Sequence, residues 1–433
     1  MFRKHRQKQP YNGLRPHVAA WEREIQRLAG RNEILCQVAD KVRGPQIFTF
    51  RLHLADPGHL SKLLSMEEQL ALVLGVPSVR VARHLGLVHL EIALPGPFHR
   101  PLPVRALNRK GGSWVTLGQT AVGTPVHINL AGTRTCHALV SGITGSGKTI
   151  AEQLIAWTLA TDNEPNAVNL LLIDGKGGTA WWGFERLPHL PHPVIGDPGE
   201  AIAALTWCVA ELDRRKTNGQ RRPALFVVVD EVRELLDAGG EPVAEAIRRV
   251  AALGRDLGIH IVVATQHALV DNLGGSIAKA NLPLRLTGRV ADATAAYVAT
   301  GVKSSGAEML QGNGDFIVTV AGVSHRLQVA MLTNREIGRL PRVEITPRLD
   351  FGDYDPARVL DVVDKPGPDP VEPDQVAVAL ASGKGITWLA NELGVGSSKA
   401  RRVREFAQLV ADKLAELGYT IIPTYHPPVA EPV

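Results

Sequence analysis

The 433-residue chain is poor in cysteine, in aromatic residues and in long apolar runs. Its three cysteines, Cys36, Cys136 and Cys208, are far apart, which argues against a disulfide scaffold and a zinc site built on cysteines. No apolar run approaches the roughly 18 positions that a membrane-spanning helix needs, and no apolar segment follows the basic N-terminus, as a secretory signal requires. We therefore expect a cytoplasmic protein, peripheral at most to the inner face of the cell membrane.

The composition is that of an ordinary globular protein, with 45% hydrophobic and 21% charged residues. At roughly 150 residues per domain, the length favours two to four domains. The formal net charge is only +5, but residues 1–31 hold eight Lys/Arg and two acidic residues. We interpret residues 1–43 as a basic arm or helix, which is either simply solvated or contacts DNA or acidic lipid.

The next two segments differ in their hydrophobic pattern. Residues 44–114 alternate short apolar runs with turns and predict a small α+β domain. Residues 115–350 contain longer apolar runs separated by helical patterns, which is typical of strands buried on both faces of a parallel sheet. This pattern predicts a doubly wound α/β domain. Its apolar runs are residues 138–140, 170–173, 225–229 and 259–264.

The C-terminal part combines a linker pattern with a helical one. Residues 351–374 are rich in proline and acid, which suits an extended linker. In residues 375–425 a helix ends near Gly394, and Ser397 or Ser398 can begin a second, basic helix. The pattern predicts a DNA-binding helix–turn–helix, although a solvated basic face would produce the same pattern. The candidate DNA contacts are Ser398, Lys399, Arg401, Arg402 and Arg404.

A phosphate-binding motif opens the α/β segment. Residues 142–149, GITGSGKT, match the pattern G-x-x-x-x-G-K-[ST] between a predicted strand and a predicted helix. Glycines let successive backbone N–H groups face a phosphate, and the helix N-terminus adds its positive dipole end. Lys148 would neutralise the β- and γ-phosphates, and the Thr149 hydroxyl would bind Mg²⁺. The motif predicts ATP and Mg²⁺ as cofactors. The predicted nucleotide-binding residues are Gly142, Thr144, Gly145, Ser146, Gly147, Lys148, Thr149 and Asp230.

Two later strands end in polar residues that complete such a site. Asp230 and Glu231 follow the apolar run 225–229. Asp230 would hold Mg²⁺, and Glu231 would orient or deprotonate the attacking water. Gln266, at the end of the run that begins at Ile259, would sense the γ-phosphate. Because the carboxyl ends of parallel strands share one edge of a sheet, we expect all three side chains near the phosphate-binding loop.

Arginines complete many phosphoryl-transfer sites by stabilising charge on the transferring group, often from a neighbouring subunit. The candidates here are Arg255, Arg285 and Arg289. Each taken alone has the alternative of a surface or ion-pair role. We expect one of the three to act in trans, with Arg255 and Arg285 as the leading candidates.

These motifs together resemble the FtsK/SpoIIIE family of DNA translocases, which belongs to the hexameric RecA-like motor ATPases. The resemblance covers roughly residues 44–345. It departs from the family pattern at Gly175, where a proline is usual, and at Thr149, where serine is common. The segments that carry it are residues 115–118, 137–142, 173–178, 254–266, 281–285 and 312–315.

The resemblance implies a RecA-like P-loop motor domain, a homohexameric ring and double-stranded DNA as substrate. It also implies that the C-terminal helix–turn–helix is a winged helix that recognises short DNA repeats. In architecture the chain is similar to the TraB/TraSA-like conjugal transfer proteins of actinomycetes, so we expect it to move plasmid or integrative-element DNA, with a membrane surface or membrane-bound transfer proteins as further partners.

Three other functions stay open. A chromosome-segregation pump would share the motor, and a protein-secretion ATPase would share the fold. A nucleotide-switched DNA-binding regulator would share the helix–turn–helix, although the intact Asp230–Glu231 pair argues against an inactive ATPase.

Overall fold

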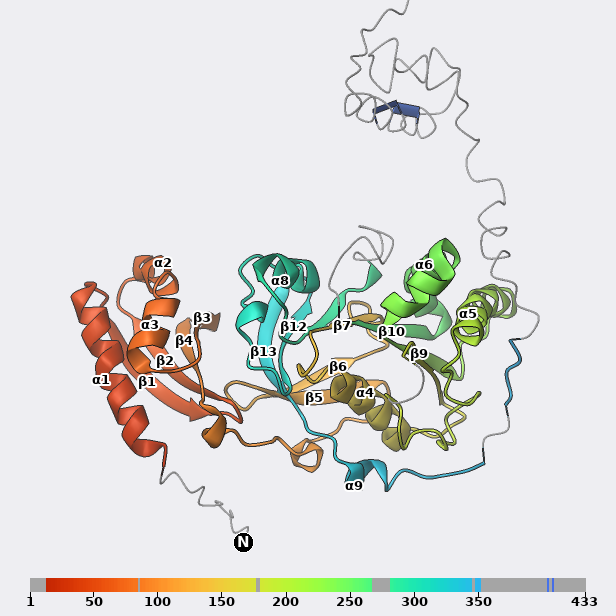
Figure 1. Ribbon diagram of the computed structural model, residues 1–433, viewed down its shortest axis with the longest axis horizontal. Helices are drawn as coiled ribbons and strands as arrows, with labels where there is room; N and C mark the ends of the chain where they lie inside the picture. The colour runs from red at the N-terminus through yellow and green to blue at the C-terminus, as the bar shows by residue number, and fades with distance from the viewer. Residues whose placement is uncertain are drawn as a thin grey trace, which may run out of the picture. The chain divides into compact units, whose positions relative to one another are not determined.

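The computed structural model describes residues 13–84, 86–176, 180–266, 281–344 and 347–351, with 403–404 and 407–408. The chain divides into two units, residues 1–359 and 360–433. Every element below belongs to the first unit (Figure 1). Apart from Phe351 and those four C-terminal residues, the predicted linker and winged helix lie outside the described residues.

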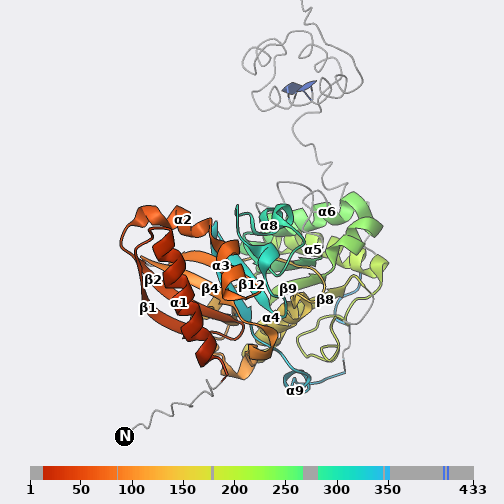
Figure 2. The same ribbon diagram turned by 60° about the vertical axis from the view of Figure 1, so that its left-hand side comes forward.

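The N-terminal elements form an antiparallel sheet of order β1-β2-β4-β3 with helices packed on it. Figure 2 shows α1 lying across this small sheet. Trp21 and Ile25 of α1 share a buried core with Phe50 of β2. Helix α1 therefore packs in the same core as β2, across the predicted boundary at residue 43. The elements are α1 (Arg15–Arg31), β1 (Cys36–Arg43), β2 (Ile47–Leu54), α2 (Leu60–Leu64), α3 (Glu67–Leu74), β3 (Val79–His84) and β4 (Leu87–Ala93).

The larger sheet has nine strands in the order β6-β5-β13-β12-β11-β7-β10-β9-β8. The strands from β11 to β8 are parallel, and the four predicted apolar runs are β7, β8, β9 and β10. The α/β class is confirmed. The sheet is mixed rather than wholly parallel, because β12, β13, β5 and β6 extend it with antiparallel pairs. Its strands are β5 (Trp114–Thr120), β6 (Pro125–Asn129), β7 (Ala138–Ser141), β8 (Val168–Asp174), β9 (Ala224–Asp230), β10 (Ile259–Thr265), β11 (Leu284–Thr287), β12 (Asp315–Val320) and β13 (Val323–Val329).

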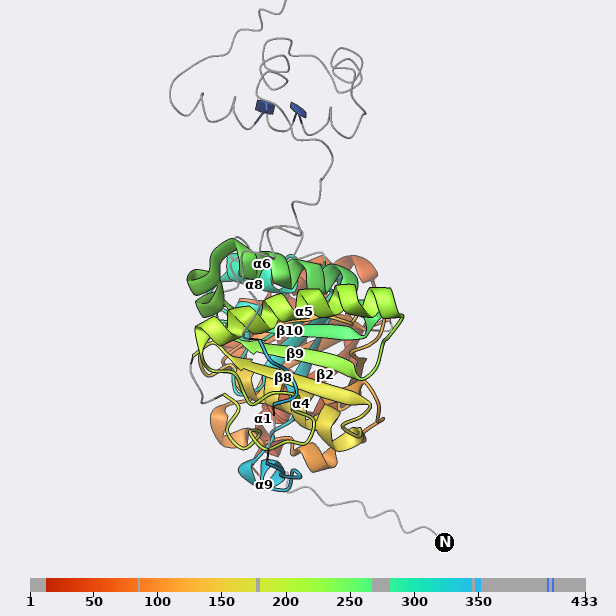
Figure 3. The same cartoon turned by 90° about the vertical axis from the view of Figure 1, so that its right-hand side faces the viewer.

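Helices cover both faces of the parallel strands, as Figure 3 shows, with α5 and α6 on one side and α4 on the other. Leu170 and Leu172 of β8 pack in the α4 core, whereas Leu171 and Ile173 pack in the α5–α6 core. Burial on both faces explains why these strands are continuous apolar runs. The helices are α4 (Lys148–Asp162), α5 (Pro198–Asn218), α6 (Val232–Leu257), α8 (Ala293–Thr300) and α9 (Asn334–Ile337).

Within the described residues, no helix has the length and apolarity that crossing a membrane would take.

Candidate active site

The phosphate-binding loop lies between β7 and α4, as predicted. Gly142, Gly145 and Gly147 have φ angles of 152°, 81° and 99°, which residues with a side chain rarely adopt. A Cβ atom at Gly147 would also lie 2.8 Å from the backbone nitrogen of Gly314. Glycine at this position therefore lets the turn at residues 312–315 pack directly against the loop.

Lys148 is buried at the first position of α4, next to two acidic side chains. Its ammonium group pairs with Asp230 and lies 3.3 Å from Oε1 of Glu152. Burial alone would lower the pKa of Lys148, but the charges of Glu152 and Asp230 outweigh burial and raise it. The lysine is therefore held as a cation before any phosphate is present.

Glu152 is a site residue that the motif analysis missed. It is fully buried one helical turn after Lys148, and burial raises its pKa well above the usual range. The available signal was the Lys148–Glu152 spacing of four residues, which places two helical side chains on the same face. Glu152 therefore contacts the Lys148 ammonium group beside Asp230, in the interior of the domain.

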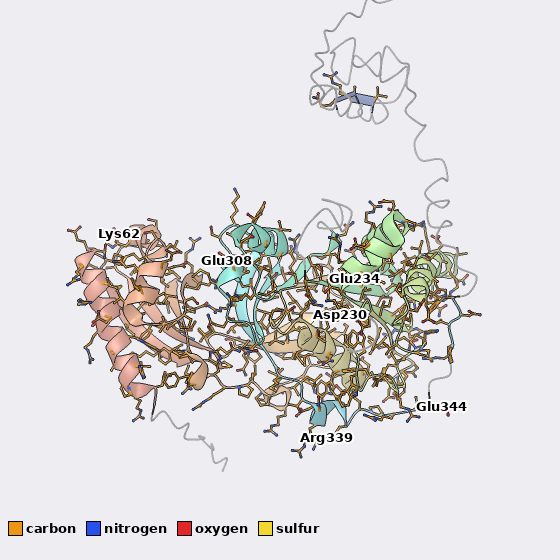
Figure 4. The ribbon with its side chains drawn as sticks, in the orientation of Figure 1. Lys62, Asp230, Glu234, Glu308, Arg339 and Glu344 are labelled. Carbon is orange, nitrogen blue, oxygen red and sulfur yellow. The ribbon has the colours of Figure 1, made fainter. Side chains whose placement is uncertain are left out.

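Asp230 is the last residue of β9, Glu231 follows it, and both are buried. Figure 4 shows Asp230 in the interior of the large domain. Glu231 has a left-handed backbone, with φ of 50°, and begins α6. Its Oε1 accepts hydrogen bonds from the Gln266 N–H at 3.1 Å and the Thr265 hydroxyl at 3.4 Å. Its Oε2 accepts from Nζ of Lys176 at 3.0 Å, so both carboxylate oxygens are occupied.

Gln266 follows β10, between β9 and the phosphate-binding strand β7. The Thr144 hydroxyl donates to its Oε1 at 3.1 Å. One residue thus contacts the phosphate-binding loop through its side chain and Glu231 through its backbone. The structure brings together Lys148, Asp230, Glu231 and Gln266, as the sequence predicts.

A cavity of about 630 Å³ opens over the loop. Its walls come partly from segments that carry no motif: Gln46 of the small domain, residues 99–102 and residues 328–332. Gln46 Nε2 donates to the Asn313 carbonyl at 2.8 Å, and Asn313 N–H donates to the Gly145 carbonyl at 3.0 Å. The small domain therefore contacts the phosphate-binding loop through the turn at residues 312–315.

The three candidate arginines lie in different places, and none lines this cavity. Arg255 is exposed near the end of α6 and pairs with Asp256 at 2.9 Å. Arg285 donates to the Val298 carbonyl of α8 at 3.2 Å, and burial lowers its pKa. Arg289 is exposed, and its carbonyl accepts from the N–H of Ile143 in the loop at 2.8 Å.

The residues present fit Mg²⁺, which prefers carboxylate, hydroxyl and phosphate oxygens. Thr149 lines the cavity, and the buried carboxylate of Asp230 contacts Lys148, another residue of its wall. Of the predicted DNA contacts, Ser398, Lys399, Arg401 and Arg402 lie outside the described residues, whereas Arg404 is described in a helical position.

Residues 105–218 and 216–270 match the family model described as the FtsK/SpoIIIE family. The chain contains an FtsK/SpoIIIE-family domain. This match confirms the family predicted from the motifs and includes the phosphate-binding loop, the Asp230–Glu231 pair and Gln266. It also supports the P-loop ATPase class to which the motifs point.

Full-length relatives and solved structures extend the similarity. The chain is 30% identical over 357 residues to DNA translocase SftA of Bacillus subtilis, covering 74% of this chain and 37% of the relative. It is 29% identical over 397 residues to DNA translocase FtsK of Helicobacter pylori, covering 84% and 46%. The chain thus spans less than half the length of these relatives.

Among solved structures, the monomer of the pCW3 conjugation coupling protein TcpA matches with a TM-score of 0.48 and 19% identity, covering 81% of this chain and 100% of that one. The cytoplasmic domain of the Thermomonospora curvata type VII secretion ATPase EccC matches with a TM-score of 0.47 and 24% identity, covering 64% and 34%.

Proposed function

We propose that this protein is an ATP-hydrolysing motor that moves double-stranded DNA. The observation that carries the proposal is the assembly of Lys148, Asp230, Glu231 and Gln266 around one glycine-rich loop, within an FtsK/SpoIIIE-family domain. A lysine, a metal-binding carboxylate, a second carboxylate and a polar sensor are the parts that P-loop ATP hydrolysis needs.

Each residue has one role in this proposal. Lys148 leaves Asp230 and Glu152 and pairs with the β- and γ-phosphates. Thr149 and Asp230 would hold Mg²⁺, and the metal would neutralise charge on the phosphate oxygens. Glu231 accepts a proton from the attacking water. Gln266 contacts Thr144 of the loop and the carboxylate of Glu231, and so couples the phosphate site to the base.

An arginine-lined groove supports DNA as the substrate. A cavity of about 440 Å³ lies between the segment around residue 105, the end of α4 and the α9 region. Arg109 lies over Trp157, 5.1 Å from the ring centroid, and pairs with Asp162. Among the described residues, no ion pair engages the groove's other arginines. These are Arg105, Arg335 and Arg339; one carboxylate, Glu336, also lines the groove and accepts a hydrogen bond from the N–H of Thr333.

Clustered like charges repel each other, so an unpaired arginine cluster is best stabilised by an anion. Arg339 lies at the surface beside α9 (Figure 4). A phosphodiester backbone would bind such a groove without regard to base sequence, as movement along DNA requires. The names of the SftA and FtsK relatives favour this substrate.

We extend the proposal to a homohexameric ring in which Arg255 or Arg285 of one subunit completes the neighbouring site. The biological route we favour is the transfer of plasmid or integrative-element DNA, because the chain resembles TraB/TraSA-like proteins. In this proposal the C-terminal segment is a winged helix that recognises DNA through Lys399 and its neighbours. The protein would then work in the cytoplasm, at the inner face of the membrane.

The test compares ATP hydrolysis with and without long duplex DNA in the wild type and in Glu231→Gln. We expect stimulation by duplex and its loss in the variant, with nucleotide binding retained. Hydrolysis that ignores DNA would contradict the DNA motor and favour a protein-secretion ATPase. Absence of hydrolysis with duplex still bound would favour a nucleotide-switched regulator.

A further inference from the structure

Lys176 holds the carboxylate that the proposed function assigns as the base. Its Nζ lies 3.0 Å from Oε2 of Glu231, while Oε1 accepts from the Gln266 N–H at 3.1 Å. The Lys176 side chain is 42% exposed and that of Glu231 only 2% exposed. The carboxylate is therefore enclosed, and the lysine is the one of these two donors that reaches solvent.

Short-range contacts at the end of β8 place this lysine. Asp174 is in register with Asp230 of β9, and its Oδ1 accepts from the Lys176 N–H at 2.9 Å. The N–H of Gly175 donates to the Asp230 carbonyl at 3.0 Å. The Gly175 hydrogen bond joins the ends of β8 and β9, the Asp174 side chain fixes the backbone of Lys176, and the Lys176 ammonium group thereby reaches Glu231.

Gly175 is what permits this approach. A Cβ atom at this position would lie 2.6 Å from the Glu231 carbonyl oxygen and 2.9 Å from that of Asp230. Real Cβ atoms do not approach backbone oxygens so closely, so any side chain here would push the segment away from Glu231. The glycine that stands here in place of the family's usual proline thus directly precedes the lysine that contacts Glu231.

A general base must come within hydrogen-bond distance of the water that it deprotonates. Oε1 of Glu231 accepts from the Gln266 N–H and the Thr265 hydroxyl, and Oε2 accepts from the Lys176 ammonium group, so each carboxylate oxygen already takes part in a charge-assisted hydrogen bond. The contact that can be given up most readily is the one to Lys176, because its ammonium group can be hydrated as Glu231 turns away.

We propose that Lys176 is a positioning residue that holds Glu231 in a resting orientation and releases it when nucleotide fills the site. The inference rests on the proposed function, since it concerns the base of that reaction. The link to the phosphate site is Gln266, whose side chain contacts Thr144 of the loop and whose N–H contacts Glu231. If the loop moves when it binds phosphate, Gln266 would therefore shift the carboxylate of Glu231.

Kinetic measurements on Lys176→Met test the proposal. Removing the ammonium group should raise the DNA-independent kcat roughly two- to fivefold, the effect of losing one partly exposed ion pair from the resting state. KM for ATP should stay within about twofold, because the lysine does not line the cavity. Lys176→Arg, which keeps the charge, should restore the low rate.

Two controls separate positioning from a general effect. Lys41→Met removes an exposed lysine that pairs with Glu22 far from the site, and it should leave kcat unchanged. Lys176→Met combined with Glu231→Gln should be as inactive as Glu231→Gln alone. A kcat that falls or does not change in Lys176→Met would overturn the proposal, as would a raised rate that survives in the double variant.

A structural measurement is independent of hydrolysis and of DNA. Crystal structures of the wild type, without nucleotide and with a non-hydrolysable ATP analogue and Mg²⁺, should show the Lys176–Glu231 pair intact in the first and separated beyond about 4 Å in the second. A pair that persists with the analogue bound would refute release by nucleotide. Failure of the DNA-motor proposal would instead appear as DNA-independent hydrolysis with the pair still opening.

Discussion

Arg326 of β13 forms a buried, two-pronged ion pair with Asp315 of β12, with nitrogen–oxygen distances of 2.9 and 2.6 Å. Its third nitrogen lies 3.7 Å from Glu91 of the small sheet, and Glu91 in turn pairs with Arg80 at 3.2 Å. Asp315 also ends the turn that packs on the phosphate-binding loop. A single arginine therefore joins the small domain to the strand pair that supports this loop.

Replacing Arg326 with methionine should destabilise the protein by about 3–5 kcal/mol, because it leaves the buried carboxylate of Asp315 without its charge partner, while Glu91 keeps only Arg80. Urea unfolding followed by circular dichroism measures the effect. Arg233→Met removes an exposed arginine paired with Asp237 and should leave the unfolding midpoint unchanged. Equal midpoints for both variants would show that the Arg326 pair contributes nothing to stability.

Acid should weaken the fold through two buried histidines of the large sheet, His137 directly before β7 and His260 in β10. Burial, with smaller effects from His260 and Arg255, lowers the pKa of His137 to about 3, and burial lowers the pKa of His260 to about 4. The unfolded chain takes up protons near pH 6.5, whereas the folded one does not, so stability is complete above about pH 7 and declines as pH falls from about 6.5 to 4.

The expected loss from His260 alone is about 3 kcal/mol once the pH reaches 4, and about 2 kcal/mol of it is present at pH 5, given 1.36 kcal/mol per unit of pKa. Urea unfolding at pH 7.5, 6 and 5 measures it. His260→Gln should flatten this pH dependence, while the exposed His53→Gln should not. A slope of the same steepness in all three proteins would place the acid sensitivity elsewhere.

Gln46 should affect nucleotide binding although it belongs to the small domain. Gln46→Ala removes the 2.8 Å hydrogen bond to the Asn313 carbonyl and with it one support of the turn against the loop. We expect KM for ATP to rise roughly three- to tenfold, as loss of about 1 kcal/mol implies, with kcat within about twofold. Steady-state ATPase kinetics measure both, and the exposed Gln37→Ala is the matched control. Unchanged KM in Gln46→Ala would mean that the contact does not support the loop.

The arginine groove should contribute to DNA affinity. Arg335→Ala with Arg339→Ala should weaken duplex binding equally for unrelated sequences and reduce the salt dependence of log Kd by about 1–2. Fluorescence anisotropy at several salt concentrations measures both. Arg214→Ala with Arg233→Ala removes the same charge from paired surface arginines and should have a smaller effect. Identical salt slopes in the two double variants would exclude the groove from DNA contact.

The chain order explains which site residues were predictable. Residues 142–149 form one contiguous motif, and Asp230, Glu231 and Gln266 each stand directly after a strong apolar run. Lys148, Asp230 and Gln266 lie at one edge of the sheet because parallel strands share their carboxyl ends. The arginines lacked such a pattern, and Arg285 proves to contact the C-terminal end of α8.

The antiparallel extension of the sheet was missed for a local reason. The β12–β13 hairpin turns through Ala321 and Gly322, whose φ angles are 50° and 79°. Positive φ at both positions is typical of a tight hairpin turn, but alanine is an uncommon residue there, so the pair carried no turn signal. The pairing of Val320 with Val323 settles the turn.

By itself, the amino-acid sequence determined the α/β class, the phosphate-binding loop and the acidic strand end, because each depends on residues that are neighbours along the chain. Only the tertiary structure decided that Lys176 contacts Glu231, that Gln46 supports the loop and that α1 joins the small domain. These contacts join segments separated by tens to hundreds of residues, and strand order and packing, rather than local spacing, bring such segments together.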